Sequence, residues 1–211
     1  MATIDSLREY RHGVWTYRPE AFDHDRPWDA PGRYTLADWE KLPEGMHCEL
    51  IEGHIVMSPT PRFNHQFFVG LLYELMTPQA RRRGDLTILS PYDVILAKDV
   101  ILEPDLIYLT KERIPQIHGW LHGAPDIVVE VVSPTSCNRD RKKKFDLYQE
   151  HRVPEYWLFD PMTESAEFYV LEHDRYRAVE PQTTTYRSPC DHGLTLDLDE
   201  LWTRYRNRPA Q

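Results

Sequence analysis

The apolar residues between positions 64 and 83 follow the period of an α-helix. One face of this helix would carry Phe67, Phe68, Leu71, Leu72 and Leu75. The pattern predicts the longest helix of the chain. A shorter helix is expected just after Thr35, because Thr35 can cap it and Asp38 occupies the third helical position. Two further helices are predicted over residues 138–150 and around residues 201–202.

Strand patterns lie between these helices. Residues 47–57, HCELIEGHIVM, alternate around a central Glu-Gly, which predicts a β-hairpin. Residues 126–132, DIVVEVV, are almost continuously apolar and β-branched, as expected of a central strand covered on both faces. Further strands are predicted over residues 93–96, 101–109, 155–159, 167–171 and 194–198. The order hairpin, helix, strands, helix, strands predicts an α/β fold with a mixed β-sheet.

The composition is that of a folded protein. Of 211 residues, 41% are hydrophobic and 28% are charged, which suits one globular domain with additions. Residues 1–33 are rich in Asp, Arg and Pro and show no clear period. We interpret them as an N-terminal arm, anchored by Trp15, Tyr17 or Trp28, that precedes a domain over residues 34–206.

The sequence shows no feature of export or membrane insertion. No apolar run approaches the roughly 20 residues that a membrane helix needs, and the first residues lack the apolar segment of a signal peptide. The cysteines, Cys48, Cys137 and Cys190, are odd in number and widely spaced. They predict neither a disulfide framework nor a zinc ribbon. We therefore expect a cytoplasmic protein without a membrane partner.

The net charge of -9 argues against a protein that coats nucleic acid by bulk electrostatics. It does not exclude a nuclease, because catalytic carboxylates add negative charge that a bound metal offsets locally. Basic residues cluster at positions 81–83 and 139–144. We interpret the first cluster as a solvated helix face.

Two acidic residues lie within apolar strand patterns. Asp105 follows Glu103 and Pro104, and Glu130 interrupts the strand at 126–132. A buried carboxylate is costly unless it is paired or holds a metal, and two of them on adjacent strands would repel each other. A hard divalent cation such as Mg²⁺ would remove this repulsion, since it prefers oxygen ligands. Taken alone, the two acids favour a structural interpretation, with Asp105 as a turn residue and Glu130 as a buried partner of Arg141 or Lys144.

The helix after Glu130 offers a basic side chain. At about 100° per residue, Lys144 shares the apolar face with Leu147 and Tyr148, whereas residues 142–143 point away. Arg141 lies on the same face, so the periodicity leaves both open. A lysine can release a proton when its pKa is lowered, which an arginine cannot do. With a metal, Lys144 could orient a water for attack on a phosphodiester.

Four ordered segments carry a resemblance to a known family. They are GMHCELIEGHIVMSPTPRFNHQ, ILEPDLIYLT, PDIVVEVVSPTS and DRKKKFDLYQEHRVPEYWLFDP. From about residue 34 to residue 201 the chain resembles the Uma-type family of putative restriction endonucleases, within the PD-(D/E)XK nuclease superfamily. The resemblance implies a restriction-endonuclease-like fold, a mixed β-sheet flanked by helices. It also implies Mg²⁺- or Mn²⁺-dependent hydrolysis of phosphodiester bonds, with DNA as the expected partner.

The resemblance also implies the site residues. Glu49 matches an acid in the hairpin, Asp105 the Pro-Asp of the metal site and Glu130 the strand acid. Val131 completes the metal-ligand set of Glu49, Asp105, Glu130 and Val131. The superfamily's usual lysine, two residues after the strand acid, is replaced here by Val132. In the Uma-type pattern a lysine of the next helix takes its place, four residues before a tyrosine, as Lys144 precedes Tyr148. The expected catalytic residues are thus Glu49, Asp105, Glu130 and Lys144.

Other readings stay open. His65 matches a histidine that the family often carries, and it could line the cleft or be structural. His118 and His122 have helical spacing, but Gly119 and Gly123 favour a loop and argue against a zinc site. The chain could be a catalytically silent nuclease-fold module for binding or interaction. It could also act on RNA or on another phosphoester. Cleavage of both DNA strands would suit a homodimer.

Overall fold

The structure is a computed structural model, and it describes residues 8–11, 14–17, 34–42, 46–57, 60–132, 138–181, 183–190 and 193–209. The chain forms two compact units. The first contains residues 1–60 and 95–103, and the second contains residues 61–94 and 104–211. The predicted boundary between an arm at 1–33 and a domain at 34–206 remains a prediction.

The first unit contains short strands and one short helix. Its elements are β1 (Arg8–Arg11), β2 (Val14–Tyr17), α1 (Leu36–Trp39), β3 (Cys48–Ile51), β4 (His54–Met57), β6 (Val94–Ala97) and β7 (Val100–Leu102). β1 pairs with β2, and the other strands follow the order β4-β3-β7-β6. The predicted hairpin at 47–57 is confirmed, with Glu52 and Gly53 at positive φ in its turn. The predicted cap of α1 is also present, since Asp38 accepts hydrogen bonds from the backbone N and Oγ1 of Thr35.

The second unit is built on a six-stranded mixed sheet. Its strands are β5 (Leu86–Leu89), β8 (Leu106–Leu109), β11 (Ile127–Val131), β12 (Glu155–Asp160), β13 (Ser165–Glu172) and β14 (Arg175–Ala178). Their order is β14-β13-β12-β11-β8-β5. The central strand β11 runs parallel to β12 and antiparallel to β8. The predicted α/β class with a mixed sheet is therefore confirmed.

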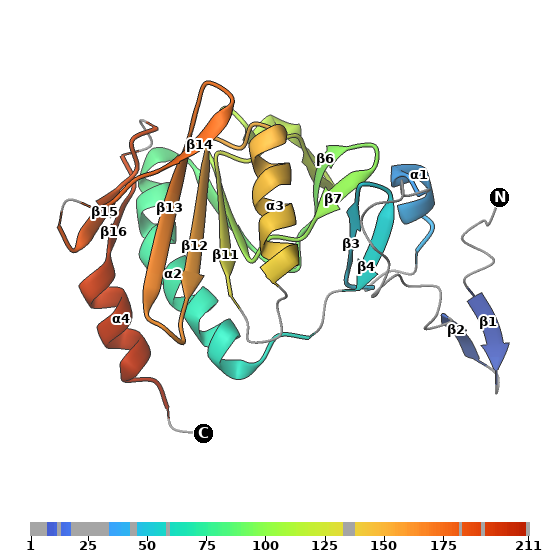
Figure 1. The fold of residues 1–211 in the computed structure, drawn as a ribbon, viewed down its shortest axis with the longest axis horizontal. Helices are drawn as coiled ribbons and strands as arrows, with labels where there is room; N and C mark the ends of the chain where they lie inside the picture. Colours follow the sequence, from blue (N-terminus) through green and yellow to red (C-terminus); the bar gives the residue numbers. More distant parts are fainter. Residues whose placement is uncertain are drawn as a thin grey trace. The chain divides into compact units, whose positions relative to one another are not determined.

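Helices cover both faces of this sheet (Figure 1). They are α2 (Phe63–Arg83), α3 (Asn138–Glu150) and α4 (Leu198–Arg206). α2 and α4 share one face, where Phe68 of α2 stacks on Trp202 of α4 with ring centroids 5.0 Å apart. α3 covers the opposite face, where Tyr148 packs on Tyr156 of β12. The smaller elements are a 3₁₀ turn at Ile114–Gln116, β9 (Ile117–His118), β10 (Trp120–His122), β15 (Thr185–Arg187) and β16 (Thr195–Asp197).

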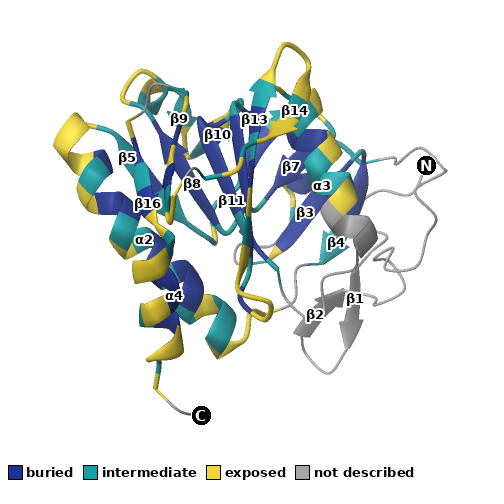
Figure 2. Cartoon of the chain, turned by 60° about the vertical axis from the view of Figure 1, so that its left-hand side comes forward, coloured by how far each residue is buried: buried dark blue, intermediate teal, exposed yellow. Residues whose placement is uncertain are grey.

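The core of the second unit lies between the sheet and the α2–α4 layer. Alternate residues of β11, namely Ile127, Val129 and Val131, join it together with Leu106 and Tyr108 of β8. Successive side chains of a strand point to opposite faces, so the residues between them face α3. Figure 2 shows the central strands buried and the outer surfaces of α2 and α4 exposed. Within the described residues, no helix is long and apolar enough to cross a membrane.

The predicted strand at 101–109 is two strands in the structure. β7 ends at Leu102 and β8 begins at Leu106, with residues 103–105 between them. Pro104 has no N–H to donate to a ladder, so the strand pairing is interrupted there. The separation puts Asp105 in a bend directly before β8, whereas the apolar pattern predicted it within a strand. The strands β1, β2, β5, β9, β10, β14 and β15 were not predicted from the sequence.

A buried carboxylate joins β12 to the C-terminal strands. Glu155 is completely buried and accepts hydrogen bonds from Trp157 Nε1 at 2.9 Å, from Tyr186 hydroxyl at 2.9 Å and from Ser188 Oγ. Three neutral donors thus replace the water that this carboxylate loses on folding.

We predict that Glu155→Ala lowers the free energy of unfolding by about 3 kcal/mol or more, because it leaves several buried donors without an acceptor. Urea denaturation followed by tryptophan fluorescence measures the change. The control is Glu172→Ala, which removes a solvent-exposed carboxylate paired with Arg177 and should change little. Equal stability of the two variants would contradict this role of Glu155.

Candidate functional site

Asp105 and Glu130 lie on neighbouring strands of the second unit. The antiparallel register pairs Leu106 with Val129, so the next position along brings Asp105 opposite Glu130. Asp105 Oδ2 accepts a hydrogen bond of 2.7 Å from the backbone N of Val131. This N–H belongs to the peptide that links Glu130 to Val131. The two acids expected from the sequence are therefore adjacent through the backbone of β11.

Glu130 faces α3, because its neighbours Val129 and Val131 face the α2 side of the sheet. Its Oε1 accepts hydrogen bonds from Lys144 Nζ at 3.0 Å and from Tyr148 hydroxyl at 2.7 Å. The Glu130 side chain is 12% exposed and that of Lys144 17%. At this depth an ion pair with a second hydrogen bond compensates the carboxylate for its lost hydration.

Lys144 reaches Glu130 because of its place on α3. Leu147 and Tyr148, on the same helix face, are 1% and 0% exposed. Lys142 is exposed to solvent. The helical period predicted this arrangement. The side chain of Arg141, the other candidate on this face, lies outside the described residues.

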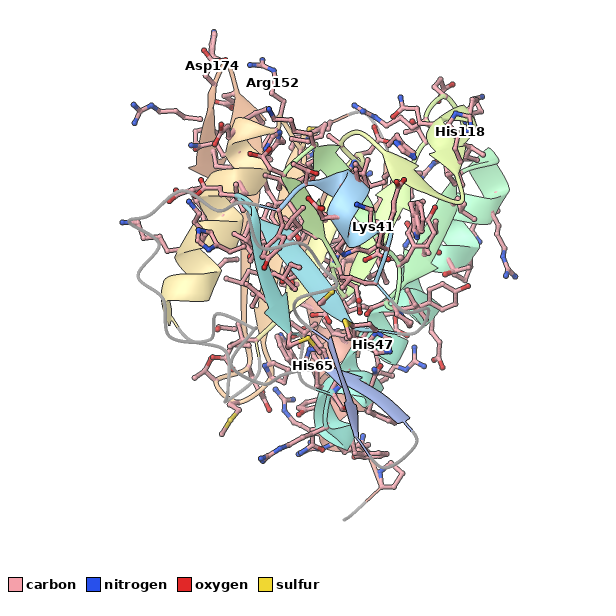
Figure 3. All side chains as sticks on the ribbon, turned by 90° about the vertical axis from the view of Figure 1, so that its right-hand side faces the viewer. Lys41, His47, His65, His118, Arg152 and Asp174 are labelled. Atoms are coloured by element: carbon pink, nitrogen blue, oxygen red, sulfur yellow. The ribbon has the colours of Figure 1, made fainter. Side chains whose placement is uncertain are left out.

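His65 joins the site from the first turn of α2 and is labelled in Figure 3. Its Nε2 lies 3.0 Å from the carbonyl oxygen of Val131 and 3.2 Å from Asp105 Oδ2. A carbonyl only accepts, so Nε2 carries the proton in this hydrogen bond. Nδ1 is buried and has no hydrogen-bond partner. The sequence placed His65 in the cleft or in a structural role, and its contact with Asp105 comes from the tertiary structure.

The pKa of His65 reflects two opposing effects. Burial favours the neutral ring and works to lower the pKa. The hydrogen bond and negative charge of Asp105 act in the other direction, with smaller help from the Val131 carbonyl and Glu130, and the net result is a raised pKa. The charged form of His65 is thus stabilised by the same carboxylate that the sequence assigns to the metal.

Glu49 belongs to the first unit. It is 6% exposed on β3, and its Oε1 accepts a hydrogen bond of 2.9 Å from the backbone N of Glu103. Glu103 Oε2 lies 3.5 Å from His47 Nδ1. Glu49 therefore anchors the segment that follows β7. Its predicted role as a metal ligand remains a prediction.

The donor atoms of the second unit suit a hard cation. Asp105, Glu130 and the Val131 carbonyl offer only oxygen, which Mg²⁺ and Mn²⁺ prefer. Oδ1 of Asp105 has no hydrogen-bond partner among the described residues. Among the residues that the structure describes, no group of three or more His, Cys, Asp and Glu side chains is arranged to hold a metal ion. The donors that fit Mg²⁺ or Mn²⁺ are therefore two carboxylates and one backbone carbonyl.

His118 and His122 do not belong to the site that contains His65. Both residues belong to the β9–β10 hairpin, which turns at Gly119 with φ 80°. Their exposed rings have centroids 6.0 Å apart. Figure 3 shows His118 well away from His65. The helical spacing is thus coincidental.

Comparison with known proteins identifies the family and the fold. Residues 35–199 match the Uma2 family, described as "Putative restriction endonuclease". The chain belongs to this family. The fold is similar to the crystal structure of a putative nuclease belonging to DUF820 from Anabaena variabilis, with a TM-score of 0.69 and 21% sequence identity. The match covers 82% of this chain and 99% of that one. No curated protein matches the chain. The restriction-endonuclease-like fold expected for the Uma2 family is confirmed.

We predict that Asp105→Asn lowers the pKa of His65, because burial of the ring remains while the negative charge is lost. The histidine Cε1–H resonance, followed by NMR across pH and assigned with His65→Gln, measures this change. In the wild type, the charged contact stabilises the fold at low pH and is lost as the pH rises through the raised pKa. The resonance of exposed His118 should not move between the variants. An unchanged His65 pKa would contradict the assigned contact.

Proposed function

We propose that the chain is a Mg²⁺-dependent endonuclease that hydrolyses phosphodiester bonds in DNA. Membership of the Uma2 family supports a nuclease-like function. The observation that carries the proposal is the arrangement around the end of β11. There Asp105 accepts a hydrogen bond from the backbone N–H of Val131, and Glu130 accepts one from Lys144 Nζ.

Asp105, Glu130 and the carbonyl of Val131 would hold the Mg²⁺ ion. When bound, the ion supplies positive charge that stabilises the phosphate in the transition state and activates water. In hydrolysis a water gives up a proton as its oxygen bonds to phosphorus, the ester P–O bond breaks, and the departing oxygen takes up a proton. Lys144 can orient the water or a phosphate oxygen by donating a hydrogen bond from Nζ. Tyr148 holds Glu130 in place, since its hydroxyl donates to the same Oε1.

His65 would position the ligands. It binds both the Asp105 carboxylate and the Val131 carbonyl, so its loss would loosen two of the three ligands at once. Glu49 is proposed as a further ligand, direct or through water. We also propose a cytoplasmic location and a homodimer, which would allow both DNA strands to be cut.

A catalytically silent binding module is the second candidate. The observation that favours it is the ion pair between Lys144 and Glu130, which neutralises the site without a metal. The net charge of -9 also weakens general affinity for DNA. Metal binding separates the two proposals, because a silent module has no need of Mg²⁺.

We predict that Asp105→Ala abolishes Mg²⁺-dependent nicking of supercoiled plasmid and weakens Mn²⁺ binding measured by calorimetry. The reason is that the variant removes a carboxylate ligand. Asp99→Ala, in the turn between β6 and β7, is the matched acidic control and should cut like the wild type. A wild-type protein that neither binds Mn²⁺ nor nicks plasmid would favour the silent module.

We predict that Lys144→Ala slows cleavage by about 10²-fold or more, within the range of a lost acid–base or water-orienting group. Metal binding should stay largely intact, since the ligands are oxygens. Lys142→Ala removes an exposed lysine of the same helix and should have little effect on cleavage. The readout is the single-turnover rate at saturating Mg²⁺. Wild-type activity of Lys144→Ala would disprove the role of Lys144 and make Arg141 the next residue to test.

A further inference from the structure

Phe63 is an unusual surface residue. Among the described residues, only Phe63 and Met162 are large hydrophobic side chains classed as exposed, with 45% of Phe63 accessible. Phe63 begins α2, two positions before His65. Its ring stacks on that of Phe67 one turn later, with centroids 5.7 Å apart and an interplanar angle of 29°. The exposed ring is therefore supported from the helix side.

Two arginines accompany this ring. Arg62 precedes Phe63, is exposed and forms no ion pair with any residue that the structure describes. Arg208 is held next to the helix start, because its Nε donates to Asn64 Oδ1 at 3.0 Å. Its guanidinium also lies 4.2 Å from the centre of the Tyr205 ring.

Neither arginine forms a direct ion pair with a described residue, although Arg208 lies near enough to Glu164 to help lower the pKa of that carboxylate. The hydrogen-bond partners of Arg208 are the Asn64 amide and the Tyr205 carbonyl, both neutral. By contrast, Arg204 and Arg206 of α4 pair with glutamates. The partial positive charge at the start of the long helix α2 adds to the charges of Arg62 and Arg208. A positive surface of this kind stands out on a chain with a net charge of -9.

From this arrangement we propose that Arg62, Phe63 and Arg208, which we call the α2 platform, bind an unpaired DNA strand. A base stacks on the exposed ring of Phe63, and the two arginines contact phosphates of the same strand. Stacking on an aromatic side chain needs a base that has left its own stack, so the preferred substrate is single-stranded or locally unpaired. An apolar protein segment could cover Phe63, but it would bring no negative charge to either arginine.

The α2 platform is continuous with the candidate site. Asn64 separates Phe63 from His65 along α2, and His65 contacts Asp105 and Val131. A strand held at Phe63 would thus pass the carboxylates at the end of β11. The cutting of that strand rests on the proposed function, whereas its binding to the platform requires no metal.

The test is binding of short fluorescent DNA by anisotropy in EDTA, with single-stranded oligothymidine and a duplex as ligands. The wild type should bind the single strand more tightly. Phe63→Ala should weaken single-strand binding by about tenfold, within the range for loss of one stacked base, and Phe63→Trp should preserve it. Thermal unfolding should be almost unchanged in both variants, because the ring is exposed. Equal single-strand affinity of Phe63→Ala and the wild type would overturn the proposal.

Arg62→Ala and Arg82→Ala form a matched pair. Both arginines are exposed, and they flank α2 at opposite ends, about 30 Å apart at roughly 1.5 Å per residue. Arg62→Ala should weaken binding of the single strand. It should also reduce the magnitude of the slope of log affinity against log salt concentration by about 1, as expected for the loss of one phosphate contact. Arg82→Ala should do neither. Equal effects of both variants would point to bulk electrostatics and overturn the platform.

Two further outcomes keep the proposals distinguishable. If Phe63 is needed for binding but no Mg²⁺-dependent cleavage occurs, the platform stands and the nuclease proposal fails. If the protein cleaves DNA while Phe63→Ala binds like the wild type, the nuclease stands and the platform fails. Light scattering adds a last check: a dimer that Phe63→Ala turns into a monomer, with unchanged DNA affinity, would make this surface a contact between two copies and overturn the proposal.

Discussion

The antiparallel register between β8 and β11 is the constraint on which the candidate site depends. It sets Leu106 opposite Val129 and so brings Asp105 to the peptide between Glu130 and Val131. Because strand side chains alternate between faces, a slip of one residue would turn Glu130 towards the apolar α2 layer. The core residues of both strands, which pack on α2 and α4, hold the register in place. Hydrophobic packing on one face thus determines where the carboxylates lie.

The end of β11 carries two charge pairs. Val131 donates its backbone N–H to Asp105 and accepts from His65 through its C=O, while Glu130 pairs with Lys144 of α3. Each of these half-buried acids therefore has a basic partner within the protein. A divalent cation that binds here must compete with His65 for Asp105 and with Lys144 for Glu130. Such competition would couple metal affinity to the contacts of both bases.

The N-terminal turn of α2 connects chemistry to recognition in the proposed enzyme. One end of this turn, at Phe63, is exposed to solvent, and His65 two residues later contacts the half-buried carboxylate of Asp105. Arg208, two residues after α4, reaches the same turn through Asn64. A single helix start can in this way hold a substrate strand and position a metal ligand, since both tasks depend on the same rigid backbone.

The sequence by itself determined the elements whose signals are local. Helical periodicity predicted α2 and α3, β-branched residues predicted β11, and the face shared by Lys144, Leu147 and Tyr148 predicted the inward-pointing lysine. The four motifs predicted the family and its fold. Only the tertiary structure decided the break at Pro104, the short strands of the sheet edges, and the contact of His65 with a carbonyl 66 residues away. These features depend on pairing between distant segments, and such pairing leaves no periodic signal along the chain.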